Sequence, residues 1–217
     1  MENNDEIKNM ENHATGSAHK EDPVCTERMP SLSRKCLHTG RVIILSDKTR
    51  ITDPCYAKDV TCTSVIPTLP GKYFIRKIYV SDIVDPNVDA LLSVAFVCHQ
   101  SVIEELIHSN FRTKFRVKCL QDMDIGVDSG ECGLYCDYKY PLRGGLEMGK
   151  SIYNEKESRY PDGDWGITFN HFGGDISPHI FGHKNEDGLY DIIYLEFGPY
   201  VSSGKELEIN NLIEITE

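Results

Sequence analysis

The sequence predicts a mostly β, β-rich α+β protein: an antiparallel β-sandwich or half-open barrel with one short helix. Short apolar runs of strand length recur along the chain, and turn-forming residues separate them. Only one segment has apolar residues at helical spacing. Many short strands with turn signals between them are typical of antiparallel sandwiches and barrels.

The expected strands come from four apolar runs. The run from Val42 to Leu45 predicts a buried strand. Residues 71–82 alternate around apolar side chains, and residues 93–100 form a compact β-branched and aromatic run. In residues 114–120, apolar side chains occupy one face and lysine and arginine the other. Each run therefore predicts one strand of an antiparallel sheet.

One helix and two turns complete the expected elements. Residues 101–111 place Val102 and Leu106 on one side of a helix, and Ser101 and Glu104 fit a capping box at its start. Residues 129–131 predict the turn of a hairpin between two strands. Asp-Gly at 187–188 precedes an apolar run and predicts a second hairpin.

Polarity divides the chain into a tail and one domain. Residues 1–38 are polar and poor in aromatic side chains, which predicts a flexible tail, and 39–217 then form a single β-rich domain. No stretch approaches the roughly 18 apolar residues of a membrane span, and the N-terminal segment lacks the apolar part of a secretory signal. We therefore expect a cytoplasmic protein with no membrane partner.

The net charge of −11 argues against an extended nucleic-acid face, because phosphate binding depends on clustered lysine and arginine. We therefore expect no nucleic-acid partner. The chain also has eight cysteines, and in a reducing cytosol these are expected to be free thiols rather than a disulfide framework.

The first candidate for chemistry is the segment around Asp53 and Cys55. Asp53-Pro54 favours a turn, which Asp53 can cap. Cys55 is a nucleophile if His99 or His171 serves as its base, or else a buried thiol. Tyr56 follows and can enter the core.

The second candidate is the acidic segment that carries Asp124, Asp128 and Glu131. Glycines at its centre exclude a helix, and on a strand two of the carboxylates share a face, where they can hold a cation or act as an acid–base pair. The alternative is that Asp128 and Ser129 cap a turn through Asx-type hydrogen bonds.

Cysteine and histidine pairs also allow a zinc site. Cys132 and Cys136 are four residues apart, as are His179 and His183. In a strand, however, residues four apart stand about 13 Å from each other. The two histidines lie in a segment expected to be a glycine- and proline-rich loop. Structural zinc is thus an alternative, and the preferred interpretation has no metal.

Two further segments invite functional interpretations. Residues 144–151 match the phosphate-loop pattern, but they neither follow a buried parallel strand nor open a helix, so a surface loop is the preferred reading. Trp165 lies in a long loop with acidic residues and His171, which predicts either a ligand mouth or a core anchor.

Three motifs together resemble a loosely defined set of bacterial and phage proteins of unknown function. They are ILSDKTRITDPCY, DIGVDSGECGLYCD and DGLYDIIYLEF, and the resemblance covers residues 43–198. This chain departs from the pattern at Glu131-Cys132 and in the residues before Asp187. The resemblance implies a compact, mostly β intracellular protein encoded on a mobile element, and it brings no catalytic residues.

The preferred function is a soluble binding module that recognises a protein partner or small ligand without a cofactor. Its expected ligand-binding residues are Asp53, Tyr56, Asp128, Ser129 and Trp165. The first alternative is a hydrolase that uses the carboxylates of Asp128 and Glu131 or the thiol of Cys55. The second alternative is the structural zinc protein.

Overall fold

A computed structural model describes residues 33–60, 62–81, 91–120, 123, 125–142, 164–170, 172, 176–197 and 206–208. For residues 33–41, 81 and 206–208 it describes the backbone alone. Several features of interest in the sequence lie outside these ranges: residues 1–32 of the expected tail, Asp124, the segment 144–151 and His171. The first strand begins at Ser33, inside the range expected to be tail.

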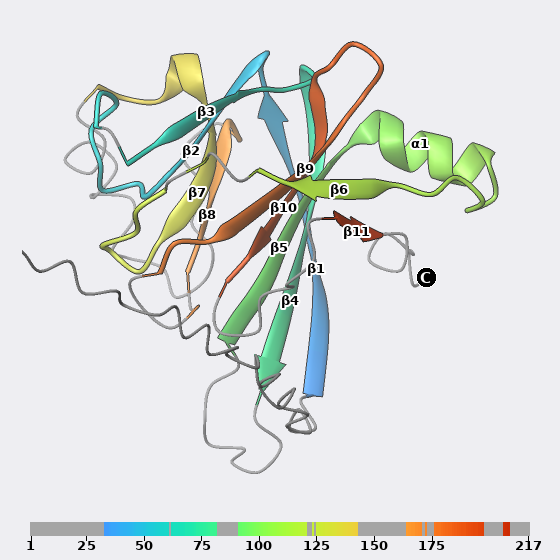
Figure 1. Cartoon of the computed structure of the whole chain (residues 1–217), viewed down its shortest axis with the longest axis horizontal. Coiled ribbons are helices and arrows are strands. Elements are labelled where there is room, and N and C mark those ends of the chain that lie inside the picture. Colours follow the sequence, from blue (N-terminus) through green and yellow to red (C-terminus); the bar gives the residue numbers. More distant parts are fainter. Residues whose placement is uncertain are drawn as a thin grey trace, which may run out of the picture. The chain divides into compact units, whose positions relative to one another are not determined.

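The larger of two sheets has seven strands in the order β1-β4-β5-β10-β9-β6-β11 (Figure 1). All of its strand pairs are antiparallel. Its strands are β1 (Ser33–Leu45), β4 (Gly71–Ser81), β5 (Leu91–His99), β6 (Arg116–Cys119), β9 (His179–Lys184), β10 (Tyr190–Glu196) and β11 (Glu206–Glu208).

The smaller sheet has four antiparallel strands in the order β3-β2-β7-β8. They are β2 (Lys48–Thr52), β3 (Ser64–Pro67), β7 (Cys132–Cys136) and β8 (Gly166–Phe169). A short 3-10 helix, η1 (Asp137–Lys139), follows β7 directly. The expectation of a β-rich α+β protein with antiparallel sheets is therefore confirmed.

Side chains from both sheets form one inner core. Leu134 of β7 and Ile167 of β8 pack in the same cluster as Ile43 of β1 and Ile193 of β10, and all four are fully buried. Burial of this apolar surface is the main force that holds the two sheets together. In β1, Ile43 and Leu45 are buried while Ile44 is 51% exposed, so this strand alternates and is not buried throughout as the sequence suggested.

A second core lies on the outer face of the larger sheet. The α-helix of the described residues, α1 (Gln100–His108), follows β5 and buries Val102 and Leu106 against Phe96 and Phe181. The expected capping box is wrong: the N-cap is His99, whose Nδ1 accepts a hydrogen bond from the Ser101 N–H at 3.1 Å.

The helix ends in a left-handed turn at Asn110 and Phe111, with φ of 51° and 58°. The Asn110 N–H donates to the Ile107 carbonyl at 3.0 Å, and the Phe111 N–H donates to the Leu106 carbonyl at 2.7 Å. These two bonds form a Schellman motif in which asparagine takes the place of the usual glycine.

The hairpin predicted at Asp187-Gly188 is confirmed, because it connects β9 with β10 and Gly188 adopts φ of 78°. The hairpin predicted around residues 129–131 is wrong. Residues 125–128 form no strand, and β7 pairs with β2 and β8 instead. Within the described part of the chain, no helix has the length and apolar character to cross a membrane.

Candidate functional site

The candidate site starts from a buried carboxylate at the end of β2. The strand stops before Pro54, and the side chain of Asp53 turns inward, where its exposed fraction is 0%. Its backbone carbonyl accepts a hydrogen bond from the Tyr56 N–H at 3.1 Å, which closes the turn. Its Oδ1 accepts from the Cys55 N–H at 2.8 Å, an Asx-type contact that fixes the same turn.

The same carboxylate holds the bend at Asp128 and Ser129. Oδ2 of Asp53 accepts hydrogen bonds from the backbone N–H groups of Asp128 at 2.9 Å and Ser129 at 2.7 Å. The hydroxyl of Ser129 donates to Oδ1 at 2.7 Å. Four hydrogen bonds therefore satisfy a fully buried charge, as a buried carboxylate requires. The two turns predicted from the sequence, at Asp53 and at Asp128-Ser129, are therefore in direct contact.

Asp128 is the carboxylate that this arrangement presents to solvent. Its side chain is exposed, and its Oδ2 accepts a hydrogen bond from the Tyr56 hydroxyl at 2.6 Å. This bond raises the pKa of Tyr56 above its ordinary value, and the nearby charge of Asp53 acts in the same direction. Among the described residues, Oδ1 of Asp128 accepts no hydrogen bond. The exposed carboxylate is therefore oriented through Oδ2, and its Oδ1 has no partner in the described part of the chain.

Cys55 lies beside this carboxylate pair and is exposed. Partial burial of the thiol, together with the hydrogen bond and charge of Asp53, raises the pKa of Cys55 to about 12. A cysteine nucleophile requires a thiolate and hence a lowered pKa. At neutral pH Cys55 is a neutral thiol, which opposes the hydrolase alternative that depends on it.

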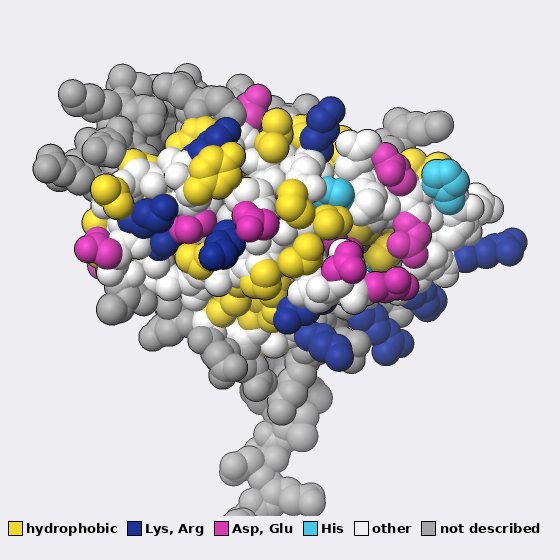
Figure 2. Space-filling model, turned by 90° about the horizontal axis from the view of Figure 1, so that it is seen from above, with side chains coloured by type: hydrophobic (Ala, Val, Ile, Leu, Met, Phe, Trp, Pro, Cys, Tyr) yellow, Lys and Arg dark blue, Asp and Glu magenta, His cyan; other side chains and the backbone are white. Residues whose placement is uncertain are grey.

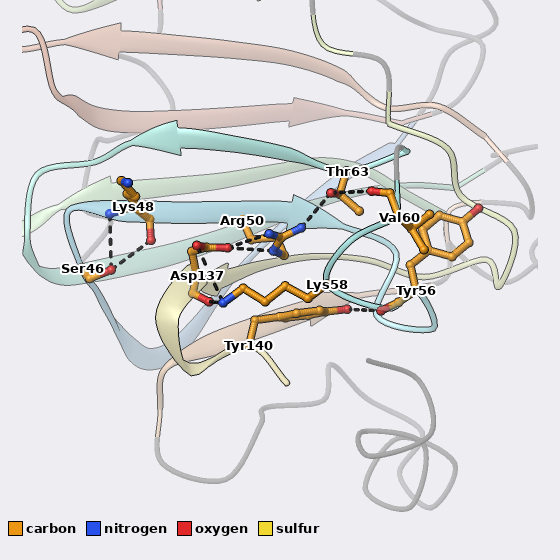
Figure 3. A network of polar contacts seen from close by, with 9 residues as sticks. All are labelled: Ser46, Lys48, Arg50, Tyr56, Lys58, Val60, Thr63, Asp137 and Tyr140. Carbon is orange, nitrogen blue, oxygen red and sulfur yellow. Dashed lines mark hydrogen bonds and ion pairs between the residues drawn. The ribbon is translucent and has the colours of Figure 1, made fainter. Parts of the chain in front are cut away.

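A second polar network holds the other side of the loop between β2 and β3 (Figure 3). Arg50 of β2 contacts Oδ1 of Asp137 through both Nε and Nη2 at 2.8 Å, and its Nη1 donates to the Thr63 hydroxyl at 2.7 Å. Nζ of Lys58 donates to the Asp137 carbonyl at 2.6 Å. The loop is therefore attached to β2 and to η1 at several points.

Tyr140 connects this network to the Asp53 turn. Its hydroxyl donates to the Tyr56 carbonyl at 2.8 Å, and its ring lies under the Arg50 guanidinium, 5.5 Å from the ring centroid. Figure 3 shows the Tyr56 ring pointing away from these contacts, in the direction opposite to Tyr140. The Tyr56 backbone is thus held by Tyr140, while its side chain points the other way and hydrogen-bonds Asp128.

Trp165 does not belong to the Asp53 site. It is half-buried and packs against Tyr135 with ring centroids 5.9 Å apart, in a cluster that also contains Tyr140. Of the five side chains expected to bind a ligand, the structure brings together Asp53, Tyr56, Asp128 and Ser129. The contacts of Trp165 agree with the core anchor that the sequence offered as its other interpretation.

The four possible zinc ligands lie in different sheets. Cys132 and Cys136 are buried in β7 of the smaller sheet. His179 and His183 lie in β9 of the larger sheet, not in a loop as expected. Among the described residues no group of three or more histidine, cysteine or acidic side chains is arranged to hold a metal ion.

His183 has another partner, which the sequence did not suggest. Its Nδ1 lies 2.7 Å from Oδ1 of the buried Asp191. The register between β9 and β10 shifts next to this residue, so Asp191 occupies a bulge. A bulge turns a side chain to a different face of a strand, and here it directs the carboxylate to the histidine.

Sequence reasoning missed Arg50, Asp137 and Tyr140. Arg50 lies 87 residues before Asp137, and an arginine between β-branched residues carries no sign of a partner that far away. Tyr140 sits in a segment that reads only as aromatic and polar. By contrast, the Asp-Pro pair and the Asp-Ser-Gly segment were visible as turns, because their residue types have strong local preferences.

No protein-family model, no curated protein and no solved structure matches this chain. Two of the three sequence motifs contact each other in the structure. The first contains Asp53 and the second contains Asp128 and Ser129, so their contact joins residues 75 positions apart. The resemblance to bacterial and phage proteins stays a prediction.

Proposed function

We propose that this protein is a non-enzymatic binding module that recognises a positively charged group of a protein partner or small ligand through the exposed carboxylate of Asp128. The observation that carries the proposal is the arrangement of this carboxylate. Tyr56 holds one of its oxygens at 2.6 Å, and the buried Asp53 fixes the backbone beneath it. A preorganised group loses less conformational entropy on binding than a mobile one.

The electrostatic environment supports a cationic ligand. Burial is the main cause of the raised pKa of Cys55, and the hydrogen bond to Asp128 is the main cause for Tyr56. The negative charges of Asp53 and Asp128 add to both shifts, and the same charges attract a cation. The net charge of the whole chain, −11, also attracts positively charged partners and accelerates their association. An ammonium or guanidinium group, as in lysine or arginine, fits the oxygen of Asp128 that has no hydrogen bond among the described residues.

A thermal-shift panel tests this proposal. The panel contains arginine amide, lysine amide and spermidine, with neutral and acidic analogues of similar size. Cationic members are expected to raise the melting temperature, because a ligand that binds only the folded state stabilises it by RT ln(1 + [L]/Kd). Asp128→Asn is expected to remove the response and Tyr56→Phe to weaken it.

Asp187→Asn serves as the matched control, because Asp187 is an exposed aspartate at the tip of the β9–β10 hairpin. This variant removes the same charge and should keep the response. A flat panel would contradict the proposal, as would equal shifts from neutral analogues. The cytoplasmic location and the mobile-element origin remain part of the proposal, on the strength of the motif resemblance alone.

A further inference from the structure

Strand β6 is next to last in the larger sheet and would be its edge without β11, and it carries exposed basic side chains. Arg116 and Lys118 are exposed on one face of this strand, while Val117 between them is fully buried on the other. Neither basic side chain makes an ion pair with a residue whose side chain the structure describes. Figure 2 shows lysine and arginine side chains gathered at one edge of the molecule, at the lower right, in a chain that is otherwise acidic.

The short strand β11 pairs with β6, and its register shows which residue types lie opposite the β6 side chains. It pairs with β6 in antiparallel register, with Glu206 opposite Lys118, Leu207 opposite Val117 and Glu208 opposite Arg116. Residues directly opposite in an antiparallel pair belong to the same face of the sheet. The edge therefore matches an acidic residue to each exposed base and an apolar residue to the buried valine.

β11 is a weak closure for this edge. In the described part of the chain it has three residues, Glu206–Glu208, and it follows β10 in sequence. Three residues form few interstrand hydrogen bonds, and an exposed pair of opposite charges across two strands contributes little to stability. Such a strand exchanges with a competing segment more readily than a long central strand does.

We propose that the β6 edge is a docking site for an acidic, extended segment of a partner protein, which adds to the sheet in place of β11. The segment has acidic residues at alternate positions around one apolar residue. Main-chain hydrogen bonds to β6 supply affinity, and the pairing with Arg116 and Lys118 supplies register and specificity. The β6 site shares no residue with the Asp128 site. The two proposals are therefore tested independently of each other.

A peptide-binding experiment with the full chain tests this inference. The probe is a fluorescein-labelled peptide with the sequence of residues 203–212, SGKELEINNL. Wild-type protein should bind it weakly, because β11 occupies the edge. The variant Glu206→Lys/Glu208→Lys repels its own β11 and should bind at least tenfold more tightly by fluorescence anisotropy. Raising the salt concentration should weaken this binding, because the charge pairs are exposed.

Two further variants in the Glu206→Lys/Glu208→Lys background separate the edge from general charge effects. Adding Arg116→Glu/Lys118→Glu should abolish binding. Adding Lys48→Glu/Lys72→Glu changes the net charge equally at exposed lysines of β2 and β4, and binding should persist. Circular dichroism confirms that each variant is folded.

Amide hydrogen exchange provides a readout that does not depend on the peptide. In the Glu206→Lys/Glu208→Lys variant, the amides of β6 should exchange faster than in the wild type and regain protection when the peptide is added. Three results would overturn the proposal: no binding by this variant while it remains folded, equal loss of binding in the Lys48/Lys72 variant, or concentration-dependent dimers that protect β6 without any peptide. The last result would assign the edge to a second copy of this chain.

Discussion

A single carboxylate, that of Asp53, organises the candidate site. Its four hydrogen bonds connect the turn after β2 with the bend at Asp128 and Ser129. Because the side chain is fully buried, it cannot bind a ligand directly. Its role is to position Asp128, and the sequence-based assignment of Asp53 to ligand binding is best understood as a positioning role.

Replacement of Asp53 by asparagine should destabilise the fold severely. The amide group of asparagine presents N–H donors at one position where the carboxylate accepts hydrogen bonds, so at least one of the four contacts is lost and the others lose the charge of the acceptor. We expect the free energy of unfolding in urea to fall by at least about 1.5 kcal/mol, since hydrogen bonds to charged groups contribute roughly 1.5–3 kcal/mol each. Asp59→Asn, at an exposed position of the same loop, should change it by less than about 0.5 kcal/mol. Equal stabilities of the two variants would refute the positioning role.

His99 should make stability depend on pH. Burial lowers the pKa of this histidine below its ordinary value of about 6.5. As the pH falls, the unfolded chain therefore takes up the proton before the folded protein does. The stabilising contribution of the neutral side chain is complete above about pH 6.5 and is lost progressively below it.

The variant His99→Asn tests this pH dependence, because asparagine is also a good N-cap but does not titrate. The difference in unfolding free energy between pH 7.5 and pH 5.5 should be smaller in this variant than in the wild type. His179→Asn, at an exposed position of β9, should leave the difference unchanged. If both variants show the wild-type difference, His99 does not contribute to it.

At the scale of elements, the smaller sheet depends on a tyrosine packed over two glycines. Tyr135 of β7 lies opposite Gly166 in β8, and its ring occupies the space where Gly133 and Gly166 would carry a β-carbon. Its hydroxyl lies 2.6 Å from that of Thr168. The glycine in the Glu-Cys-Gly segment is thus required by packing and not by a turn.

Gly133→Ala should destabilise the protein by about 1–3 kcal/mol, because the added methyl group meets the ring of Tyr135. The same substitution in a Tyr135→Leu background should cost less, because leucine leaves part of that space empty. A double-mutant cycle in urea measures this coupling. Additive effects of the two substitutions would show that the contact with the ring is not the cause.

Elements were predictable from the sequence where local preferences and burial agree. The strand at β6 has strictly alternating side chains, and the Asp-Gly turn has a strong intrinsic preference, so both were correct. The prediction of a hairpin at Ser129 was wrong because Asp53 holds the residues of this bend, and no partner strand does. The prediction of the helix cap was wrong because the N-cap is His99, the last residue of β5, and not Ser101.

At the scale of the whole molecule, both sheets contribute to one inner core, so they should unfold together. Leu134 of the smaller sheet and Ile193 of the larger one are fully buried in the same cluster. Leu134→Ala and Ile193→Ala should each reduce the free energy of unfolding by about 2–5 kcal/mol. In both variants, Trp165 fluorescence and far-ultraviolet circular dichroism should give one common midpoint in urea.

Separate midpoints for the two signals would contradict this shared core. Trp165 reports on the smaller sheet, because it packs against Tyr135 of β7. Circular dichroism reports on all strands. A fluorescence transition that shifts in Leu134→Ala but not in Ile193→Ala would show that the smaller sheet unfolds by itself.

Fold class was predictable at this scale, but the strand order was not. Antiparallel pairing followed from short strands and turns, whereas the pairing of β10 with β5 depends on contacts between distant parts of the chain. No local pattern encodes such a pairing. The contact between Asp53 and the Asp128 backbone is also long-range, so the sequence did not predict it. The residue types at each position predicted the two turns only.

The late position of β10 in the chain has a consequence for biosynthesis. This strand fills the middle of the larger sheet, yet residues 190–196 leave the ribosome after eleven of the described elements have been made. Until then β5 and β9 lack their shared neighbour and expose unpaired backbone groups, which promote aggregation. A premature stop codon before residue 190 should therefore yield insoluble polypeptide that is degraded, whereas one after residue 197 should spare the central sheet and remove, of the described elements, β11 alone.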